Sequence, residues 1–328
     1  MRKFSSFFIA AAAVLMAAGL TACGSKTETA GQSDDSIQIV TTIFPEYDWV
    51  QNILGENPAK AEVTMLLDSG VDLHSYQPTA EDILKISTCD MFIYVGGESD
   101  GWVESALREA ANKDMVVINL LEMLGEEAKE EELVEGMEEE EEGEEEEEGP
   151  MYDEHIWLSL RNAAALCDGI AEAIESIDPD NASVYKDNVA LYKEKLDALD
   201  TEYQKAVSEA SVNILLFGDR FPFRYLVDDY GLNYYAAFVG CSAETEASFE
   251  TITFLAQKVD ELSLSCVMAV EGAQHRIAET IVENTQSGNQ QVLTIDSMQS
   301  TTSRDVQNGV TYLSIMESNL EVLKEALK

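Results

Sequence analysis

From residue 37 onwards, short apolar runs rich in β-branched residues alternate with longer amphipathic stretches. Strands separated by helices of about ten residues or more are typical of parallel βαβ units. The pattern therefore predicts the α/β fold class, with two similar α/β lobes built on parallel sheets. The expected strands are 37–43, 61–66, 91–95, 116–120, 213–217, 234–238, 266–270 and 292–295.

A long amphipathic pattern lies between these two groups of strands. Residues 181–211 carry apolar side chains at steps of three and four, and Asp178-Pro179 separates them from a helix expected at 158–177. A helix of about thirty residues is roughly 45 Å long. That length predicts a strut between two lobes. The expected boundaries are an N-terminal lobe at 37–177, a linking helix at 178–211 and a C-terminal lobe at 212–328.

The first residues follow the pattern of a secretory signal peptide. Arg2 and Lys3 precede an apolar stretch at 7–18 that is too short for a stable span. Residues 20–23, Leu-Thr-Ala-Cys, then resemble the lipobox of bacterial lipoproteins. We expect residues 1–22 to be cleaved, Cys23 to carry a lipid anchor and residues 23–36 to form a flexible tether outside the cytoplasm. An ordinary signal peptide with an incidental cysteine is the alternative.

Composition narrows the classes of partner. The chain has 20 Lys and Arg against 63 Asp and Glu, a formal net charge of −43, which argues against nucleic acid. Ten of the eleven residues at 138–148 are glutamate. Such a run repels itself, so we expect a mobile acidic loop at 126–150. The simplest interpretation of the acidic loop is that it keeps the protein soluble. The functional alternative is that it binds cations weakly and raises their concentration near the metal site.

Two of the three histidines stand in positions that favour metal binding. His74 follows a predicted strand and precedes a helix that begins at Thr79, where Asp82 completes a capping box. Ligands of open α/β sheets bind at such strand ends. His155 follows the acidic run and begins the apolar segment His-Ile-Trp-Leu. Because imidazole and carboxylate groups bind divalent cations, a cation-binding protein is the first hypothesis.

The remaining cysteines do not indicate a particular function. They contain no Cys-x-x-Cys pair, so neither a cysteine zinc site nor a thioredoxin-like motif is supported. Outside the cytoplasm a Cys241–Cys266 disulfide is an open alternative. The four cysteines are Cys89, Cys167, Cys241 and Cys266.

Several segments resemble the zinc and manganese ABC-transporter solute-binding lipoproteins of the ZnuA/TroA type. They are VTTIFPEYDWV, DLHSYQPTAEDI, DEHIWLSL, FRYLVDDYGL and ETEASFETI, and the resemblance runs through essentially the whole mature chain. It implies a TroA-like solute-binding fold, two lobes joined by one long rigid helix, with a metal ion between them. It also implies capture of that ion outside the cell and its delivery to an ABC permease in the cytoplasmic membrane, by a monomer with no enzymatic activity.

On this resemblance His74 and His155 match the first two ligands of the family. The third ligand position falls on Arg220, whose guanidinium has no lone pair to offer. We therefore expect neighbouring Asp219 to take that role. Pairing of Asp219 with Arg220 or Arg224 in a salt bridge is the alternative.

The fourth ligand of the family is an acid after the last strand, and Asp296 occupies that place. A role as a helix or turn cap is the alternative for Asp296. Glu271 is held as a reserve ligand. His275, the third histidine, is a weaker reserve and fits a helix start on the surface.

Two imidazoles with oxygen ligands suit Zn²⁺ and also accept Mn²⁺, and the Irving–Williams order favours zinc. Zinc is therefore the expected cargo, with a manganese-specific protein of the same type as the alternative. A metal-binding surface adhesin and a hydrolytic metalloenzyme are the rivals from other classes. The sequence supplies no His-Glu-x-x-His motif for the latter.

Overall fold

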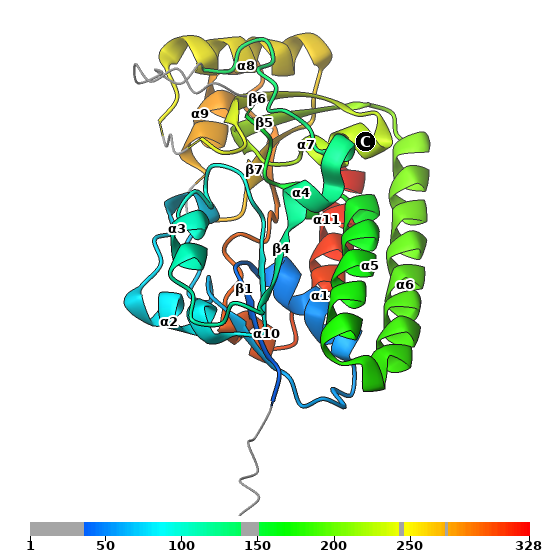
Figure 1. The fold of residues 1–328 in the computed structure, drawn as a ribbon. Helices are drawn as coiled ribbons and strands as arrows, with labels where there is room; N and C mark the ends of the chain where they lie inside the picture. The colour runs from blue at the N-terminus through cyan, green and yellow to red at the C-terminus, as the bar shows by residue number, and fades with distance from the viewer. Residues whose placement is uncertain (1–35, 139–150, 243–245, 273–274) are drawn as a thin grey trace, which may run out of the picture. The chain divides into compact units, whose positions relative to one another are not determined.

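Two parallel four-stranded sheets organise the computed structural model (Figure 1), which describes residues 36–138, 151–242, 246–272 and 275–328. The strand order is β2-β1-β3-β4 in the first sheet and β6-β5-β7-β8 in the second, so each sheet repeats the same connection pattern. The predicted α/β class with two similarly built sheets is confirmed. The strands are β1 Gln38–Thr41, β2 Glu62–Met65, β3 Met91–Tyr94, β4 Val116–Asn119, β5 Ile214–Phe221, β6 Asn233–Val239, β7 Cys266–Val270 and β8 Gln291–Ile295.

The central strands are more deeply buried than those at the edges. Every residue of β7 is buried, as is nearly all of β1 and β3, whereas β2 and β8 are exposed or half-buried except at their last residue. Parallel sheets need cover on both faces, and continuous apolar runs in the central strands provide the matching surface. The eight apolar runs of the sequence each correspond to one of these strands.

Helices connect the strands and cover the sheets. Helix α2 begins at Thr79 with the predicted capping box, in which Thr79 and Asp82 exchange hydrogen bonds. The helices are α1 Phe44–Leu54, α2 Ala80–Thr88, α3 Val103–Arg108, α4 Leu120–Leu124, α5 Leu160–Ile177, α6 Ala182–Ser208, α7 Arg224–Tyr230, α8 Phe249–Leu262, α9 Arg276–Asn284, α10 Ser303–Gln307 and α11 Tyr312–Ala326. Among the described residues, no helix is both long and apolar enough to cross a bilayer.

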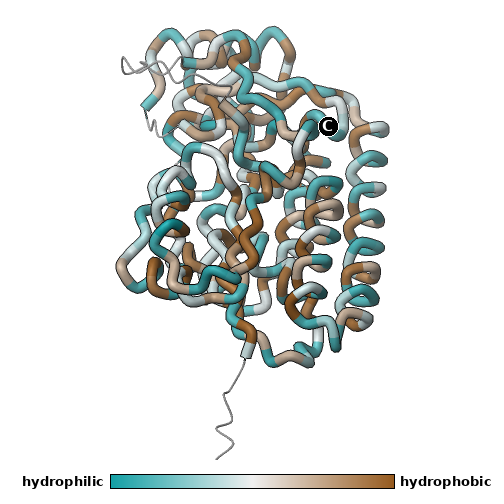
Figure 2. The backbone as a smooth tube through the Cα atoms, viewed as in Figure 1, coloured by the Kyte–Doolittle hydropathy of each residue, from teal (hydrophilic) through white to brown (hydrophobic). Residues whose placement is uncertain are grey.

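Helix α6 follows the first sheet in the chain and leads into the second. It has 27 residues, about 40 Å of helix, and packs against α5, α1 and α11. Hydrophobic and hydrophilic positions alternate along it (Figure 2), and its buried side includes Tyr185, Leu196 and Tyr203. The Tyr203 hydroxyl donates to the carbonyl of Met316 at 2.6 Å, which fixes α6 to α11.

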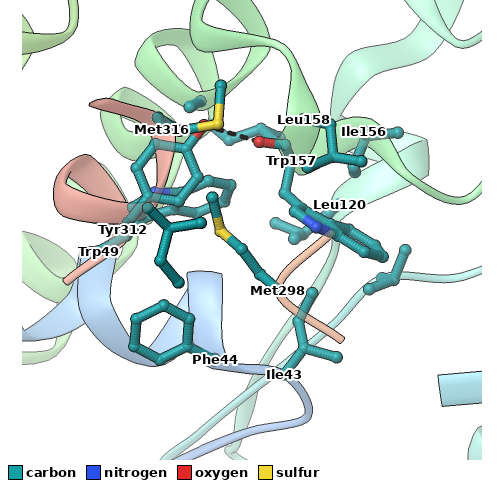
Figure 3. Close-up of a cluster of buried hydrophobic side chains, with 14 of the residues drawn as sticks. Ile43, Phe44, Trp49, Leu120, Ile156, Trp157, Leu158, Met298, Tyr312 and Met316 are labelled. Carbon is teal, nitrogen blue, oxygen red and sulfur yellow. Dashed lines mark hydrogen bonds between the residues drawn. The ribbon is translucent and has the colours of Figure 1, made fainter. Parts of the chain in front are cut away.

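One large hydrophobic cluster includes residues of both sheets, and the segment after His155 passes through it. Trp157 is fully buried there with Trp49 of α1 and Tyr312 of α11 (Figure 3). The Tyr312 hydroxyl donates to the carbonyl of Trp157 at 2.7 Å, and Trp157 Nε1 donates to the carbonyl of Ser297 at 2.8 Å. The position of His155 is therefore set by packing and hydrogen bonds from distant parts of the chain.

The predicted acidic loop divides into two parts. Residues 126–138 are hydrogen bonded to the body: Lys129 accepts from Asp153 N at 2.8 Å, and Glu138 N donates to Ala237 O at 3.0 Å. This part of the interval predicted as mobile is thus an ordered segment, because its backbone groups find partners. Residues 139–150, with most of the glutamate run, lie outside the described residues, as do residues 1–35 with the predicted signal peptide and Cys23.

All four described cysteines are free, so the open alternative of a Cys241–Cys266 disulfide is not formed. Cys266 begins β7, whereas Cys241 follows the end of β6. Because the strands of this sheet are parallel, the start of β7 and the end of β6 lie at opposite ends of the strands. A disulfide requires Cα atoms within about 7 Å.

Candidate metal centre

His74 is presented by a short turn that follows β2. The turn Leu73–Ser75 is closed by Asp72, whose Oδ1 accepts from the backbone N–H of His74 at 3.0 Å. On the ring, Nδ1 lies 2.7 Å from Ser99 Oγ and 3.4 Å from Glu154 Oε2. These contacts engage Nδ1, so Nε2 is the ring nitrogen that remains available to a ligand.

His155 is held in the same manner by Asp153. Asp153 Oδ1 accepts from the backbone N–H of His155 at 2.8 Å and lies 3.1 Å from its Nδ1. A carboxylate accepts hydrogen bonds, so this contact places the ring hydrogen on Nδ1 and a lone pair on Nε2. The side chain is fully buried. Burial lowers the pKa of His155 well below its usual value, and the nearby charges of His74 and Arg220 lower it further.

The two histidines face each other. His74 Nε2 and His155 Nε2 are 3.1 Å apart, and the ring centroids are separated by 5.1 Å. Two nitrogen ligands about 2.0–2.1 Å from a tetrahedral zinc ion would lie roughly 3.3–3.4 Å from each other. The observed separation is therefore close to that needed by two imidazoles sharing one ion.

A third group of the kind that binds metals lies beside this pair. Among the described residues, ligand atoms of His74, His155 and Cys241 all lie within 4.8 Å of one another. Cys241 was not among the expected ligands. The signal that would have found it is its place shortly after the predicted strand 234–238, because the ends of parallel strands are where ligands were already expected.

Gly240 allows the chain that carries Cys241 to approach His155 closely. A Cβ atom at this position would lie 3.0 Å from Cε1 and Nδ1 of His155 and 2.9 Å from the carbonyl oxygen of Phe221. Real Cβ atoms essentially never come as close as 2.9 Å to a backbone oxygen, and contacts of 3.0 Å are tighter than most, so a side chain here would require movement. The absence of a side chain thus brings the end of β6 against the histidine.

The acidic residues expected as ligands have other contacts. Asp219 Oδ1 accepts from Arg220 N at 2.9 Å, and its Oδ2 accepts from Val270 N at 3.1 Å, which joins β5 to β7. Burial raises the pKa of Asp219. Asp296 Oδ1 accepts from Met298 N at 2.7 Å, the turn-capping arrangement held as its alternative. Neither belongs to the group formed by the two histidines and Cys241.

The reserve candidates also lie elsewhere. Glu271 accepts hydrogen bonds from Ser297 N at 2.6 Å and Ser297 Oγ at 2.8 Å. His275 stands immediately before α9, and its Nε2 lies 3.3 Å from Thr294 Oγ1. The structure therefore brings together His74 and His155, and it places Asp219, Asp296, Glu271 and His275 outside their immediate cluster.

Arg220 connects the second sheet to the turn that carries His74. Its guanidinium forms an ion pair with the carboxylate of Asp72, and Arg224 pairs instead with Glu132 at 3.0 Å and Asp228 at 2.8 Å. Burial alone would raise the pKa of Asp72, but the hydrogen bond and charge of Arg220 outweigh burial and lower it. The alternative salt bridges proposed for Asp219 are thus not formed.

An open hollow of about 690 Å³ adjoins the candidate centre. Its lining includes Asp72 and Ser75 on one side and Asp219, Arg220, Ser242 and His275 on the other. Asp72 and Ser75 flank His74, and Ser242 follows Cys241. The hollow therefore gives solvent an approach to the residues around the cluster.

Comparison with known proteins identifies the family. The model of the family "Zinc-uptake complex component A periplasmic" (ZnuA), a zinc-uptake component rather than an enzyme, matches residues 39–326. The high-affinity zinc uptake system protein ZnuA of Bacillus subtilis is 30% identical over 332 residues, covering 99% of this chain and 98% of that protein. The zinc-binding lipoprotein AdcA of Streptococcus pneumoniae serotype 4 is 30% identical over 95% of this chain. The match spans 59% of that longer protein.

Solved structures agree with this assignment. The Zn(II)-bound ZnuA-like domain of Streptococcus pneumoniae AdcA superposes with a TM-score of 0.69 at 28% identity, covering 89% of this chain and 99% of that chain. The metal-dependent lipoprotein YcdH of Bacillus subtilis superposes with a TM-score of 0.71 at 26% identity, with the same coverage of each chain. The resemblance seen in the sequence is confirmed, and the chain belongs to the ZnuA family of zinc-uptake components.

Proposed function

We propose that this protein captures Zn²⁺ outside the cytoplasm and delivers it to an ABC permease for import. The observation that carries the proposal is the facing pair of imidazole nitrogens, His74 Nε2 and His155 Nε2, 3.1 Å apart. Each ring is held through its other nitrogen, by Ser99 and Glu154 on one side and by Asp153 on the other. Such supporting contacts orient the ligating nitrogen of metal-binding histidines.

The ionisation of the pair suits a cation as cargo. Burial keeps His155 neutral by lowering its pKa, so its Nε2 lone pair is available near neutral pH. Zn²⁺ binds well to nitrogen ligands, whereas Mn²⁺ prefers sites rich in oxygen. Because Asp219 and Asp296 hold backbone N–H groups, the donor set around the pair favours zinc over the manganese alternative.

Membrane attachment is part of the same proposal. The lipobox-like residues 20–23 support lipidation of Cys23, which would hold the body of the protein at the outer side of the cytoplasmic membrane. A permease in that membrane is the partner that an uptake component requires. The family match to a zinc-uptake component supports this partner.

Calorimetric titration with Zn²⁺ tests the proposal. The chain from residue 24 onwards retains the whole compact unit that begins at Ser36. We expect tight binding at one site, weakened by about 100-fold or more in His74→Ala and in His155→Ala, since loss of even an outer partner of a metal ligand costs about 10–100-fold. His275→Ala is the matched control and should bind zinc as the unsubstituted protein does.

Two outcomes would count against zinc capture. Weak binding at several sites that persists in a His74→Ala/His155→Ala variant would place the metal on surface carboxylates. A parallel Mn²⁺ titration that gave the tighter binding would instead support the manganese alternative.

A further inference from the structure

The Cys241 thiol is the third potential metal ligand of the candidate centre. Its sulfur lies within 4.8 Å of the ligand atoms of both His74 and His155. The residue follows β6 of the second sheet, whereas His74 lies in the turn that follows β2 of the first. A sulfur ligand here would therefore complete the centre from the opposite side.

The surroundings of Cys241 fix it in this place. Gly240 packs its backbone directly against the ring of His155, with no room for a side chain. The backbone N–H of Cys241 donates to Glu131 Oε1 at 3.1 Å, which places this carboxylate beside the residue. Glu131 belongs to the ordered part of the acidic segment, which is anchored by a hydrogen bond from Glu131 N to Met151 O at 2.9 Å.

Other groups that might supply the third ligand are engaged elsewhere. Arg220 offers no lone pair and is paired with Asp72. Both carboxylate oxygens of Asp219 accept backbone N–H groups. Among the described residues, the thiol is the additional donor within reach of both imidazoles.

We infer that the Cys241 thiolate is the third metal ligand, that Glu131 positions it, and that the sulfur makes the centre select Zn²⁺ over Mn²⁺. The inference rests on the proposed function and deepens it. Thiolate is a soft ligand that zinc binds at about 2.3 Å, whereas manganese favours oxygen ligands. Two imidazoles and one thiolate leave a fourth position of a tetrahedral ion for water or another oxygen.

Metal binding replaces the proton of the thiol. Burial, followed by the carboxylates of Glu131, Asp153 and Glu154, raises the pKa of Cys241, so the metal-free residue is a thiol. Binding of Zn²⁺ would form a bond between sulfur and zinc and break the covalent S–H bond, and the proton would leave to solvent water, with the Glu131 carboxylate beside the residue as an acceptor. No electron changes hands.

Cobalt substitution tests for the sulfur ligand directly. A thiolate bound to Co²⁺ gives a charge-transfer absorption in the near ultraviolet that imidazole and carboxylate ligands do not give. We expect this band in the unsubstituted protein loaded with Co²⁺ and its loss in Cys241→Ser. Cys266→Ala is the matched control. Cys266 lies at the start of β7, at the opposite end of the strands from Cys241, so this variant should keep the band.

Affinity measurements test the effect on selectivity. Cys241→Ser should lose about 100-fold or more in zinc affinity, at least as much as the loss of an outer partner, while Mn²⁺ affinity changes far less. Glu131→Gln should lose about tenfold in zinc affinity and retain the cobalt band, as expected for a positioning residue. Thermal unfolding of each metal-free variant checks that it is folded.

A measurement without substitution keeps the inference testable if Cys241→Ser does not fold. Zinc should protect Cys241 of the unsubstituted protein from alkylation, as mapped by mass spectrometry of its peptides. Histidine-dependent zinc binding without a cobalt band and without protection would overturn the role of Cys241 and leave the zinc function standing. Zinc binding that does not depend on His74 and His155 would remove the proposed function itself.

Discussion

Replacing Gly240 by alanine tests whether close packing onto His155 sets the affinity for zinc. The added methyl carbon would lie 3.0 Å from Cε1 and Nδ1 of His155 and 2.9 Å from the carbonyl oxygen of Phe221. Carbon atoms in contact prefer about 3.5–4.0 Å, so the ring or the loop must move by about 0.5–1 Å. Because the opposing oxygen belongs to strand β5, the movement falls on His155 or on the loop that carries Cys241.

The expected loss of zinc affinity follows from the energy cost of overpacking and from the tolerance of metal–ligand distances. Overpacking a well-packed site costs about 1–3 kcal/mol of stability. Metal–ligand distances tolerate deviations of about 0.2 Å, which is smaller than the expected displacement. The protein must therefore undo this displacement to bind zinc. If the same 1–3 kcal/mol opposes binding, zinc affinity falls by roughly 5- to 150-fold.

Calorimetric titration with Zn²⁺ and thermal unfolding of the metal-free protein measure the two effects separately. Gly231→Ala is the matched control. Gly231 ends α7 with a φ of 69°, and an added Cβ there would have no described atom within 4 Å. Left-handed backbone costs an alanine about 1–2 kcal/mol, so this control should lose stability and keep its zinc affinity. Unchanged zinc affinity in Gly240→Ala would refute the reasoning.

Two further predictions concern stability. The metal-free protein should melt at a higher temperature near pH 5 than near pH 7.5, because burial raises the pKa of Asp48 to about 6 and of Asp100 to about 7. Between about pH 4 and 7 the folded state then binds more protons at these two carboxyl groups than the unfolded state does, so stability falls as pH rises. The pKa of His155 is lowered by burial, so this single group contributes a change in stability of the opposite sign. A melting temperature that rises over this range would contradict the assignment. Tyr312→Phe removes the donor to Trp157 O and should cost about 1–3 kcal/mol in denaturant unfolding, and an unchanged midpoint would show that the bond contributes nothing.

The fold was predictable because the strands carry a strong pattern. Every expected strand is present, and the pattern is strongest in the central strands, whose continuous apolar runs are buried on both faces of the parallel sheets. The end of β5 was placed too early, at residue 217. The strand continues to Phe221 through an irregularity between Phe217 and Arg220, where polar residues interrupt the apolar run. Helices α3, α7 and α10 have only 5 to 7 residues, and such short helices depend on packing that a local pattern does not record.

The candidate centre was predictable where the local sequence builds the support of the ligand. Asp72 closes the turn that presents His74, and Asp153 holds His155 from two residues away. Both supports are close in sequence to the histidine they hold, so a short motif contains them. Cys241 has no such motif. Its position depends on which strand ends lie close together across the two sheets. It also depends on Gly240, which packs against His155, and that contact joins residues far apart in the sequence.

The contrast between Arg220 and Cys241 explains how a ligand position can be filled from another strand. β5 and β6 are parallel neighbours, so their carboxyl ends reach the same edge of the sheet. An arginine at the end of β5 would repel an incoming cation, but here its charge is paired with Asp72. The thiol after β6 then supplies the negative charge that an acid on β5 would have given. Two neutral imidazoles and one thiolate compensate about one of the two positive charges of Zn²⁺, and the carboxylates of Glu154 and Asp153 stand directly behind the imidazoles of His74 and His155.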